Sequence, residues 1–119
     1  YPGTGAESET GVGNIANLPM AAGEGSDAFR KGYTRQLLPA LREFDPDLLI
    51  ISAGFDAHER DPLAQIGLQE DDYTWVTREL REIAEDCCNG RLVSSLEGGY
   101  NLDALAKSTA AHVRVLLES

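Results

Sequence analysis

A carboxylate and a phenol each follow a short predicted strand of this sequence. Asp56 comes after Leu48–Ala53 and Gly54, and Tyr100 comes after the run Arg91–Leu96. A short apolar run that ends in glycine is typical of a strand buried on both faces of a parallel sheet. Open α/β sheets bind their ligands at the carboxyl ends of such strands. A carboxylate at that place can cap the next turn, and it can also serve as a metal ligand.

The segments around these two residues predict alternating helices and strands. Ser26-Asp27 can cap a first helix, which Pro39 should kink and Asp45-Pro46 should end. Gln69–Asp72 supplies acid for the start of a second helix, and Asn89-Gly90 supplies a left-handed stop. After a glycine-rich loop at 1–25 with one short edge strand at 15–20, the predicted order is helix 26–44, strand 48–53, helix 69–88, strand 91–96 and helix 102–117.

The helix between the two predicted strands makes the strands parallel neighbours. A strand–helix–strand crossover is right-handed and brings both carboxyl ends to one edge of the sheet. Asp56 and Tyr100 are therefore expected in one site, although 44 positions separate them in the sequence. This expectation follows from the connectivity alone.

Two strands are too few for a self-sufficient parallel sheet. Leu48–Ala53 has no polar face, so it requires further strands and helices on both of its sides. The chain opens at Tyr1, without a methionine, in what resembles the middle of a loop. We therefore expect a part of a longer protein, in which the remainder of the domain or self-association covers the exposed sheet.

The composition argues against several classes of partner. The 119 residues are 42% hydrophobic and 25% charged, with a formal net charge of −10. That charge argues against direct binding to a nucleic-acid backbone, and no apolar stretch approaches the roughly 20 residues of a membrane span. The first residues have neither the basic nor the apolar region of a signal peptide. Cys87 and Cys88 are adjacent and have no other cysteine to pair with, so we expect reduced thiols and a cytoplasmic location.

Five segments carry a resemblance to a known family. They are YPGTG at 1–5, GNIANLP at 13–19, SAGFDAH at 52–58, DPL at 61–63 and LEGGYN at 96–101. In this order and spacing they resemble the C-terminal portion of the zinc-dependent histone deacetylase family. The bacterial branch, with its acetoin-utilisation and acetylpolyamine-amidohydrolase types, is the most similar.

The resemblance covers essentially the whole chain and implies its fold and its activity. The implied fold is an arginase-like, three-layer αβα domain with a parallel sheet, of which residues 1–119 are the C-terminal part. Within it, 1–25 would be an active-site loop region and 26–119 the α/β part. The implied reaction is zinc-dependent removal of an acetyl group from acetylated lysine or a polyamine-type amine.

The resemblance also assigns roles to residues at the predicted sheet edge. Asp56 matches the family's last zinc ligand, and a catalytic zinc site needs three protein ligands with one open position. Tyr100 matches the family's catalytic tyrosine, whose phenol donates a hydrogen bond to the oxyanion of the tetrahedral intermediate. Gly98 and Gly99 would let the backbone approach the substrate closely.

Weaker assignments follow for three other positions. Tyr1 falls where the family has an aromatic wall of the acyl-lysine tunnel, and Leu63 would line the same tunnel or belong to the core. Asn14 lies where the family offers a backbone carbonyl to a structural monovalent cation, such as K⁺. His58 is interpreted as part of the loop structure rather than a ligand, and His112 as packing or surface.

The sequence contains no pair of adjacent histidines, and its one Asp-x-His triplet, Asp56-Ala57-His58, includes the already assigned Asp56, so a second such triplet is absent. The family's general base and its other zinc ligands come from such motifs, so we expect these residues alone to be inactive.

Two alternative functions stay open at this point. A ureohydrolase on a related fold would use two Mn²⁺ ions and an Asp-x-Asp, although His58 stands where its second carboxylate would be. A non-catalytic binding module would hold an anion at the helix start Gly98–Asn101.

Overall fold

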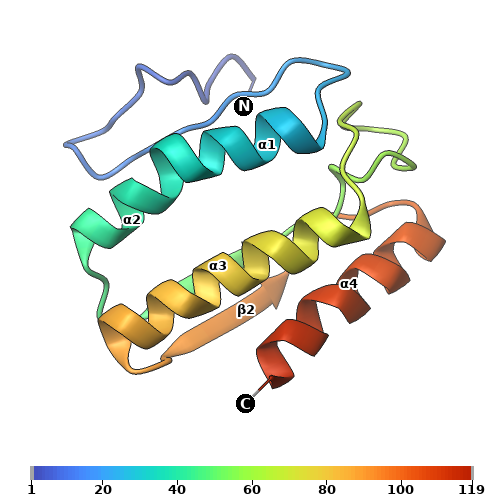
Figure 1. The fold of residues 1–119 in the computed structure, drawn as a ribbon. Coiled ribbons are helices and arrows are strands. Elements are labelled where there is room, and N and C mark those ends of the chain that lie inside the picture. The colour runs from blue at the N-terminus through green and yellow to red at the C-terminus, as the bar shows by residue number, and fades with distance from the viewer. Residues whose placement is uncertain (1, 119) are drawn as a thin grey trace.

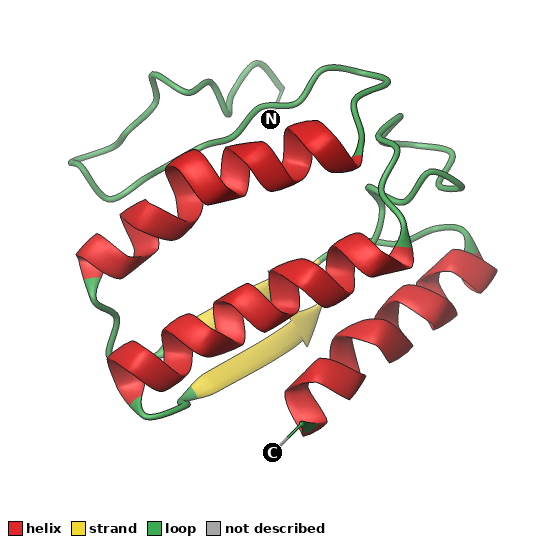
Figure 2. Cartoon of the chain, viewed as in Figure 1, coloured by secondary structure: helices red, strands yellow, loops and turns green. Residues whose placement is uncertain are grey.

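The computed structural model describes residues 2–118. It alternates helices and strands in the predicted order, after a long N-terminal loop (Figures 1 and 2). The elements are α1 (Ser26–Gly32), η1 (Tyr33–Leu37), α2 (Leu38–Phe44), β1 (Leu49–Ala53), α3 (Glu70–Cys88), β2 (Leu92–Leu96) and α4 (Leu102–Leu117).

The two strands form a parallel pair, as predicted from the crossover. Leu49 lies opposite Leu92 and Ala53 lies opposite Leu96, so the strands end in register. The connection between them runs through α3, which covers the pair in Figure 2. Both carboxyl ends therefore meet at one edge of the sheet.

The helices cover one face of this sheet. Leu49 and Ala53 point toward the helices and are buried, whereas Ile50 is 63% exposed and Val93 is 54% exposed on the other face. In Figure 1 the α1–η1–α2 segment, α3 and α4 lie side by side as one layer. The predicted α/β class with a parallel sheet is confirmed. Of the three expected layers, residues 2–118 supply two, because nothing among them covers the second face.

The first helical segment differs from its predicted start. Its N-cap residue is Gly25 rather than Ser26, and it has no side-chain cap. The Ser26 hydroxyl instead donates to the buried carboxylate of Asp72, at 2.6 Å. Asp72 also accepts from Arg30 Nε at 2.9 Å, so one carboxylate ties α1 to the first turn of α3.

The interruption predicted at Pro39 takes the form of a π-helical turn. Tyr33–Leu37 forms η1 directly before α2, and Pro39 lies in the first turn of α2. Proline has no N–H to donate, and its ring would crowd the carbonyl four residues earlier in a regular α-helix. The wider turn of η1 relieves that conflict without ending the helical segment.

The remaining boundaries follow the predicted signals. α3 begins with a capping box between Gln69 and Asp72 and ends at Asn89, which adopts the left-handed conformation with φ of 53°. α4 begins after Asn101, whose Oδ1 accepts from Ala104 N at 2.9 Å.

The edge strand predicted at 15–20 is wrong, since this stretch is loop. Among residues 2–118, no helix combines the length and the apolar character needed to cross a bilayer.

A buried histidine joins α4 to the rest of the core. His112 is 6% exposed; its Nδ1 lies 2.8 Å from Thr77 Oγ1 on α3, and its Nε2 lies 2.8 Å from Ser94 Oγ on β2. Thr77 already donates its hydroxyl proton to the carbonyl of Tyr73. His112 must therefore donate from Nδ1, and in the neutral imidazole Nε2 then accepts the Ser94 hydroxyl proton.

Burial lowers the pKa of His112 below its ordinary value of 6.5. The unfolded chain therefore takes up a proton at a higher pH than the folded chain does. Stability contributed by neutral His112 is complete above pH 6.5 and is lost as the pH falls through that value. We expect the free energy of unfolding, measured by urea titration, to decrease between roughly pH 7 and pH 5.5.

His112→Gln should make that decrease shallower, because glutamine can donate and accept without titrating. The slope with pH is the diagnostic quantity, since lost packing alone shifts stability equally at every pH. An unchanged slope in the variant would contradict a neutral buried His112.

Candidate active site

Two loops lie side by side where β1 and β2 end. Glu97 N donates to Ala53 O at 2.9 Å, and Phe55 N donates to Gly98 O at 2.8 Å. These bonds continue the strand pairing beyond the sheet. The loop that carries Asp56 and the loop that carries Tyr100 are therefore brought together, as the connectivity predicted.

Two glycines make room for the Asp56 carboxylate. A Cβ on Gly98 would lie 3.1 Å from Asp56 Cγ and 3.3 Å from each carboxylate oxygen. A Cβ on Gly54 would lie 3.1 Å from Asp56 Oδ1. These separations are tighter than ordinary contacts, so a side chain at either position would press on the carboxylate. The sequence interpretation explained Gly98 by close approach of a substrate, whereas its neighbour here is Asp56 itself.

The Asp56 carboxylate is half-buried, and none of the residues 2–118 donates a hydrogen bond to it or pairs with it. A carboxylate in such surroundings keeps its lone pairs available for a cation. A carboxylate whose oxygens are free in this way fits the role of one zinc ligand. Within residues 2–118, no cluster of three or more His, Cys, Asp or Glu side chains is placed to hold a metal ion. The described residues therefore offer one candidate ligand rather than a complete site.

Tyr100 combines a fixed backbone with an exposed side chain. Its N–H donates to Asp61 Oδ2 at 2.8 Å, while the residue as a whole is 57% exposed. Gly99, just before it, has φ of +143°, and a Cβ there would lie 2.8 Å from Leu105 Cδ1. Glycine is needed at this position both for its conformation and for packing against α4.

Asp61 is the residue of this edge that the sequence interpretation missed as a functional candidate. It is 7% exposed and accepts two backbone hydrogen bonds, from Tyr100 and, at 2.9 Å, from Leu63. The signal available in the sequence was the Asp-Pro pair, which was used only as part of the segment DPL at 61–63 that resembles the family. Leu63 itself is 64% exposed, which places its side chain at the surface rather than in the core.

Tyr73 places a second phenol beneath the site. Its ring packs edge-on against Phe55, with centroids 5.0 Å apart, and its hydroxyl is buried without a hydrogen-bond partner among residues 2–118. Burial, followed by the negative charges of Asp56, Asp72 and Asp61, raises the pKa of Tyr73. The phenol therefore stays protonated at neutral pH.

His58 acts as part of the loop, as predicted. It is 2% exposed, and its Nδ1 accepts from Arg60 N at 3.1 Å. Its Nε2 lies 3.3 Å from Glu70 Oε1, within the reach of an ion pair but without hydrogen-bond geometry. The side chain thus faces α3 and holds the turn that leads to Asp61.

One predicted position is not brought to this edge, and another lies outside the part of the chain that the structure describes. Asn14 lines a groove with Leu41 and Phe44 of α2, and its side chain accepts from Val12 N at 3.1 Å. Tyr1 lies outside the described residues. The roles proposed for Asn14 at a monovalent cation and for Tyr1 in a tunnel wall stay predictions.

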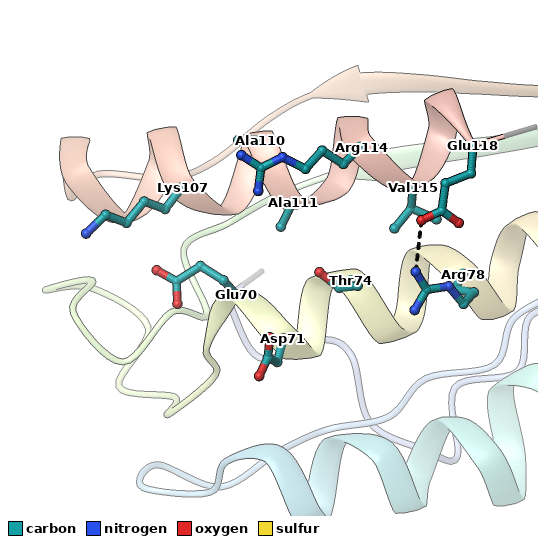
Figure 3. Close-up of a pocket in the computed structure, with 10 residues that line it drawn as sticks. All are labelled: Glu70, Asp71, Thr74, Arg78, Lys107, Ala110, Ala111, Arg114, Val115 and Glu118. Atoms are coloured by element: carbon teal, nitrogen blue, oxygen red, sulfur yellow. Dashed lines mark hydrogen bonds and ion pairs between the residues drawn. The ribbon is translucent and has the colours of Figure 1, made fainter.

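A groove lies elsewhere, between α3 and α4 (Figure 3). It has a volume of about 460 Å³ and is lined by side chains of both charges. Arg78 pairs with Glu118 at 3.0 Å across its end, as the dashed line in Figure 3 shows. None of its lining residues belongs to the loops of Asp56 or Tyr100, so this groove is separate from the candidate site.

Comparison with known proteins identifies the family of this chain. Residues 1–116 match the histone deacetylase domain. Histone deacetylase 14, chloroplastic, of Arabidopsis thaliana is 40% identical over 121 residues, which cover 98% of this chain and 29% of that protein. The histone deacetylase-like amidohydrolase of Pseudomonas aeruginosa is 41% identical over 93 residues, or 78% of this chain and 24% of that protein.

Solved structures agree in fold. The HDA15 HD domain superposes with a TM-score of 0.88 at 38% identity, over 98% of this chain and 33% of that domain. The histone deacetylase Clr3 gives the same TM-score at 36% identity, over 98% of this chain and 20% of that one. The chain spans about a third or less of these proteins. The arginase/deacetylase fold class is thereby confirmed, and the chain belongs to the histone deacetylase family.

Proposed function

We propose that these residues form the part of a zinc-dependent amidohydrolase that supplies one metal ligand and the oxyanion donor. The substrate is an acetylated amine, of the acetyl-lysine or acetylpolyamine type. One observation carries the proposal: the half-buried carboxylate of Asp56 accepts no hydrogen bond from residues 2–118, and its neighbouring loop carries Tyr100.

Asp56 is the residue that would hold the zinc ion, with further ligands from outside these residues. A zinc ion bound there supplies Lewis-acid chemistry at the acetamide carbonyl and lowers the pKa of a bound water. Gly54 and Gly98 leave the carboxylate space to adopt the direction that coordination requires. Because neither glycine has a side chain, neither position brings a group that would compete with the zinc ion for the carboxylate oxygens.

Tyr100 would donate its phenolic hydrogen to the oxyanion that develops when water attacks the acetyl carbon. A donor placed where negative charge develops lowers the barrier by about 3 kcal/mol. Its side chain is exposed at the sheet edge, so a substrate can reach it. Leu63, exposed on the adjoining loop, would contact the apolar stem of the substrate. The zinc site, the Tyr1 wall and the K⁺ ligand at Asn14 rest on the family resemblance.

The bare sheet face supports the need for further chain. Ile50 and Val93 lie opposite each other on the exposed face, and Leu48, which is 49% exposed, extends the apolar surface at one end. The solved HDA15 domain is about three times as long as this chain, which covers 33% of it. We therefore propose that the remaining strands and helices of a deacetylase domain cover this face. The missing zinc ligands and the general base would come from the same segments.

The family match favours this proposal over the ureohydrolase and the binding module considered from the sequence. Position 58 is a histidine, so the second carboxylate of an Asp-x-Asp motif is absent. The His58 side chain also faces α3 rather than the sheet edge. A reducing compartment such as the cytoplasm suits Cys87 and Cys88, which are both free thiols.

A chimera tests the proposed activity. Residues 1–119 are substituted for the matching segment of the HDA15 HD domain, and deacetylation of an acetyl-lysine peptide and an acetylpolyamine is measured. Asp56→Ala should reduce turnover by more than about 100-fold, because even partners of metal ligands cost about 10- to 100-fold. Tyr100→Phe should reduce kcat about 100- to 1,000-fold, the cost of one lost oxyanion donor.

Matched controls separate this chemistry from loss of fold. Asp47→Ala and Tyr33→Phe make the same chemical changes away from the sheet edge and should retain activity. Residues 1–119 alone, with zinc added, should give no turnover. Turnover by the isolated chain that Asp56→Ala abolishes, or an active chimera indifferent to Asp56→Ala, would contradict the proposal.

The bare sheet face gives a separate prediction for the isolated chain. A fluorescent dye that reports exposed apolar surface should bind it, and Ile50→Thr with Val93→Thr should weaken that binding. Val12→Thr is the control, because Val12 is 96% exposed on the N-terminal loop rather than on the sheet. If the double variant binds dye as strongly as the unmodified chain, the sheet face is not the apolar surface left uncovered. Self-association that the double variant abolishes would identify a second copy as the occupant instead.

A further inference from the structure

Asp61 connects the two segments that the proposed function places at the active site. Its Oδ1 accepts from the N–H of Leu63 at 2.9 Å, and its Oδ2 accepts from the N–H of Tyr100 at 2.8 Å. Leu63 lies two residues away in the sequence, whereas Tyr100 lies 39 residues away. One buried carboxylate therefore fixes the backbone at the expected substrate contact relative to the backbone at the expected oxyanion donor.

The loop around Asp61 is itself anchored. Asp61 N donates to His58 O at 2.9 Å, and His58 is almost fully buried. Pro62 follows and has no N–H, so the first amide within reach of Oδ1 is that of the next residue. Arg60 pairs with Asp103 of α4 at 2.7 Å, on the same side of the molecule as the Tyr100 loop. Asp61 thus acts from a fixed position rather than from a free loop.

A carboxylate suits this position better than any neutral side chain of similar shape. Both of its oxygens are acceptors, so it satisfies two N–H groups at once. Asparagine has the same shape but only one acceptor, and its NH₂ would face one of the two amide hydrogens. Because the Asp61 side chain is buried, water cannot replace the bond that is lost.

We propose that Asp61 is the positioning residue for Tyr100. By holding the Tyr100 amide, it sets where the phenol stands relative to Asp56 and to the substrate contact at Leu63. This inference rests on the proposed function. It assigns no contact with substrate or metal to Asp61, which acts through the backbone of Tyr100.

A double-mutant cycle in the chimera tests the positioning role. Asp61→Asn alone should lower kcat about 10- to 100-fold, the size of effect that a misplaced catalytic group produces, with KM within about two-fold. In the Tyr100→Phe background the same substitution should change kcat by less than about two-fold, because there is no phenol left to position. A merely structural role for Asp61 would lower activity by the same factor in both backgrounds.

Hydrogen exchange of the full 119-residue chain gives a readout independent of activity. Asp61→Asn should speed exchange of the Tyr100 amide by about 10-fold or more, because that amide loses its acceptor. Amides in the middle of α3 should keep their rates, which shows that the fold persists. Asp47→Asn is the matched control: it makes the same change on an exposed side chain at the opposite end of β1, and it should leave both rates unchanged.

The outcomes separate this inference from the proposed function. Equal losses in the two tyrosine backgrounds, or a Tyr100 amide that exchanges at the unmodified rate, would overturn the role of Asp61. A folded chimera with no activity before any change at position 61 would count against the proposed function. The exchange experiment would then still decide whether Asp61 holds Tyr100.

Discussion

The parallel pairing of β1 with β2 is the constraint on which the rest of this structure depends. Because both strands run the same way and end in register at Ala53 and Leu96, the loops that follow them must share one edge. Two backbone hydrogen bonds beyond the strands then hold these loops together. This pairing brings the loop of Asp56 and the loop of Tyr100 side by side. The helices support the pair from one face, and Asp61 and the neighbouring glycines shape the loops at its edge.

Three aspartates with buried or half-buried carboxylates differ in the hydrogen bonds that they accept. Asp72 accepts from Ser26, Arg30 and Gln69, which compensates the loss of hydration. Asp61 accepts from two backbone amides. Asp56 accepts from none of the described residues, although glycines beside it leave its oxygens accessible. A chain that satisfies two such groups and leaves the third open has a carboxylate available for a cation.

The parts of this arrangement that could be predicted from the sequence are the ones set by local patterns. Apolar periodicity and the glycine and asparagine signals gave the order and most boundaries of the elements, and connectivity alone placed Asp56 beside the Tyr100 loop. Contacts between distant positions could not be predicted in this way. The hydrogen bond between Asp61 and Tyr100 joins residues 39 positions apart. The Ser26 hydroxyl bonds to Asp72, 46 positions away, instead of capping α1. No periodicity encodes such pairs, because they depend on how finished elements pack.

Anomalous diffraction from crystals of the chimera, grown with zinc and with data collected at the zinc edge, tests the central claim most directly. The account predicts one zinc ion with an Asp56 oxygen about 2.0–2.2 Å away, the usual zinc–carboxylate distance. The phenol of Tyr100 should face the open coordination position of that ion. A zinc ion bound without Asp56, or a pair of manganese ions at this edge when both metals are offered, would contradict it.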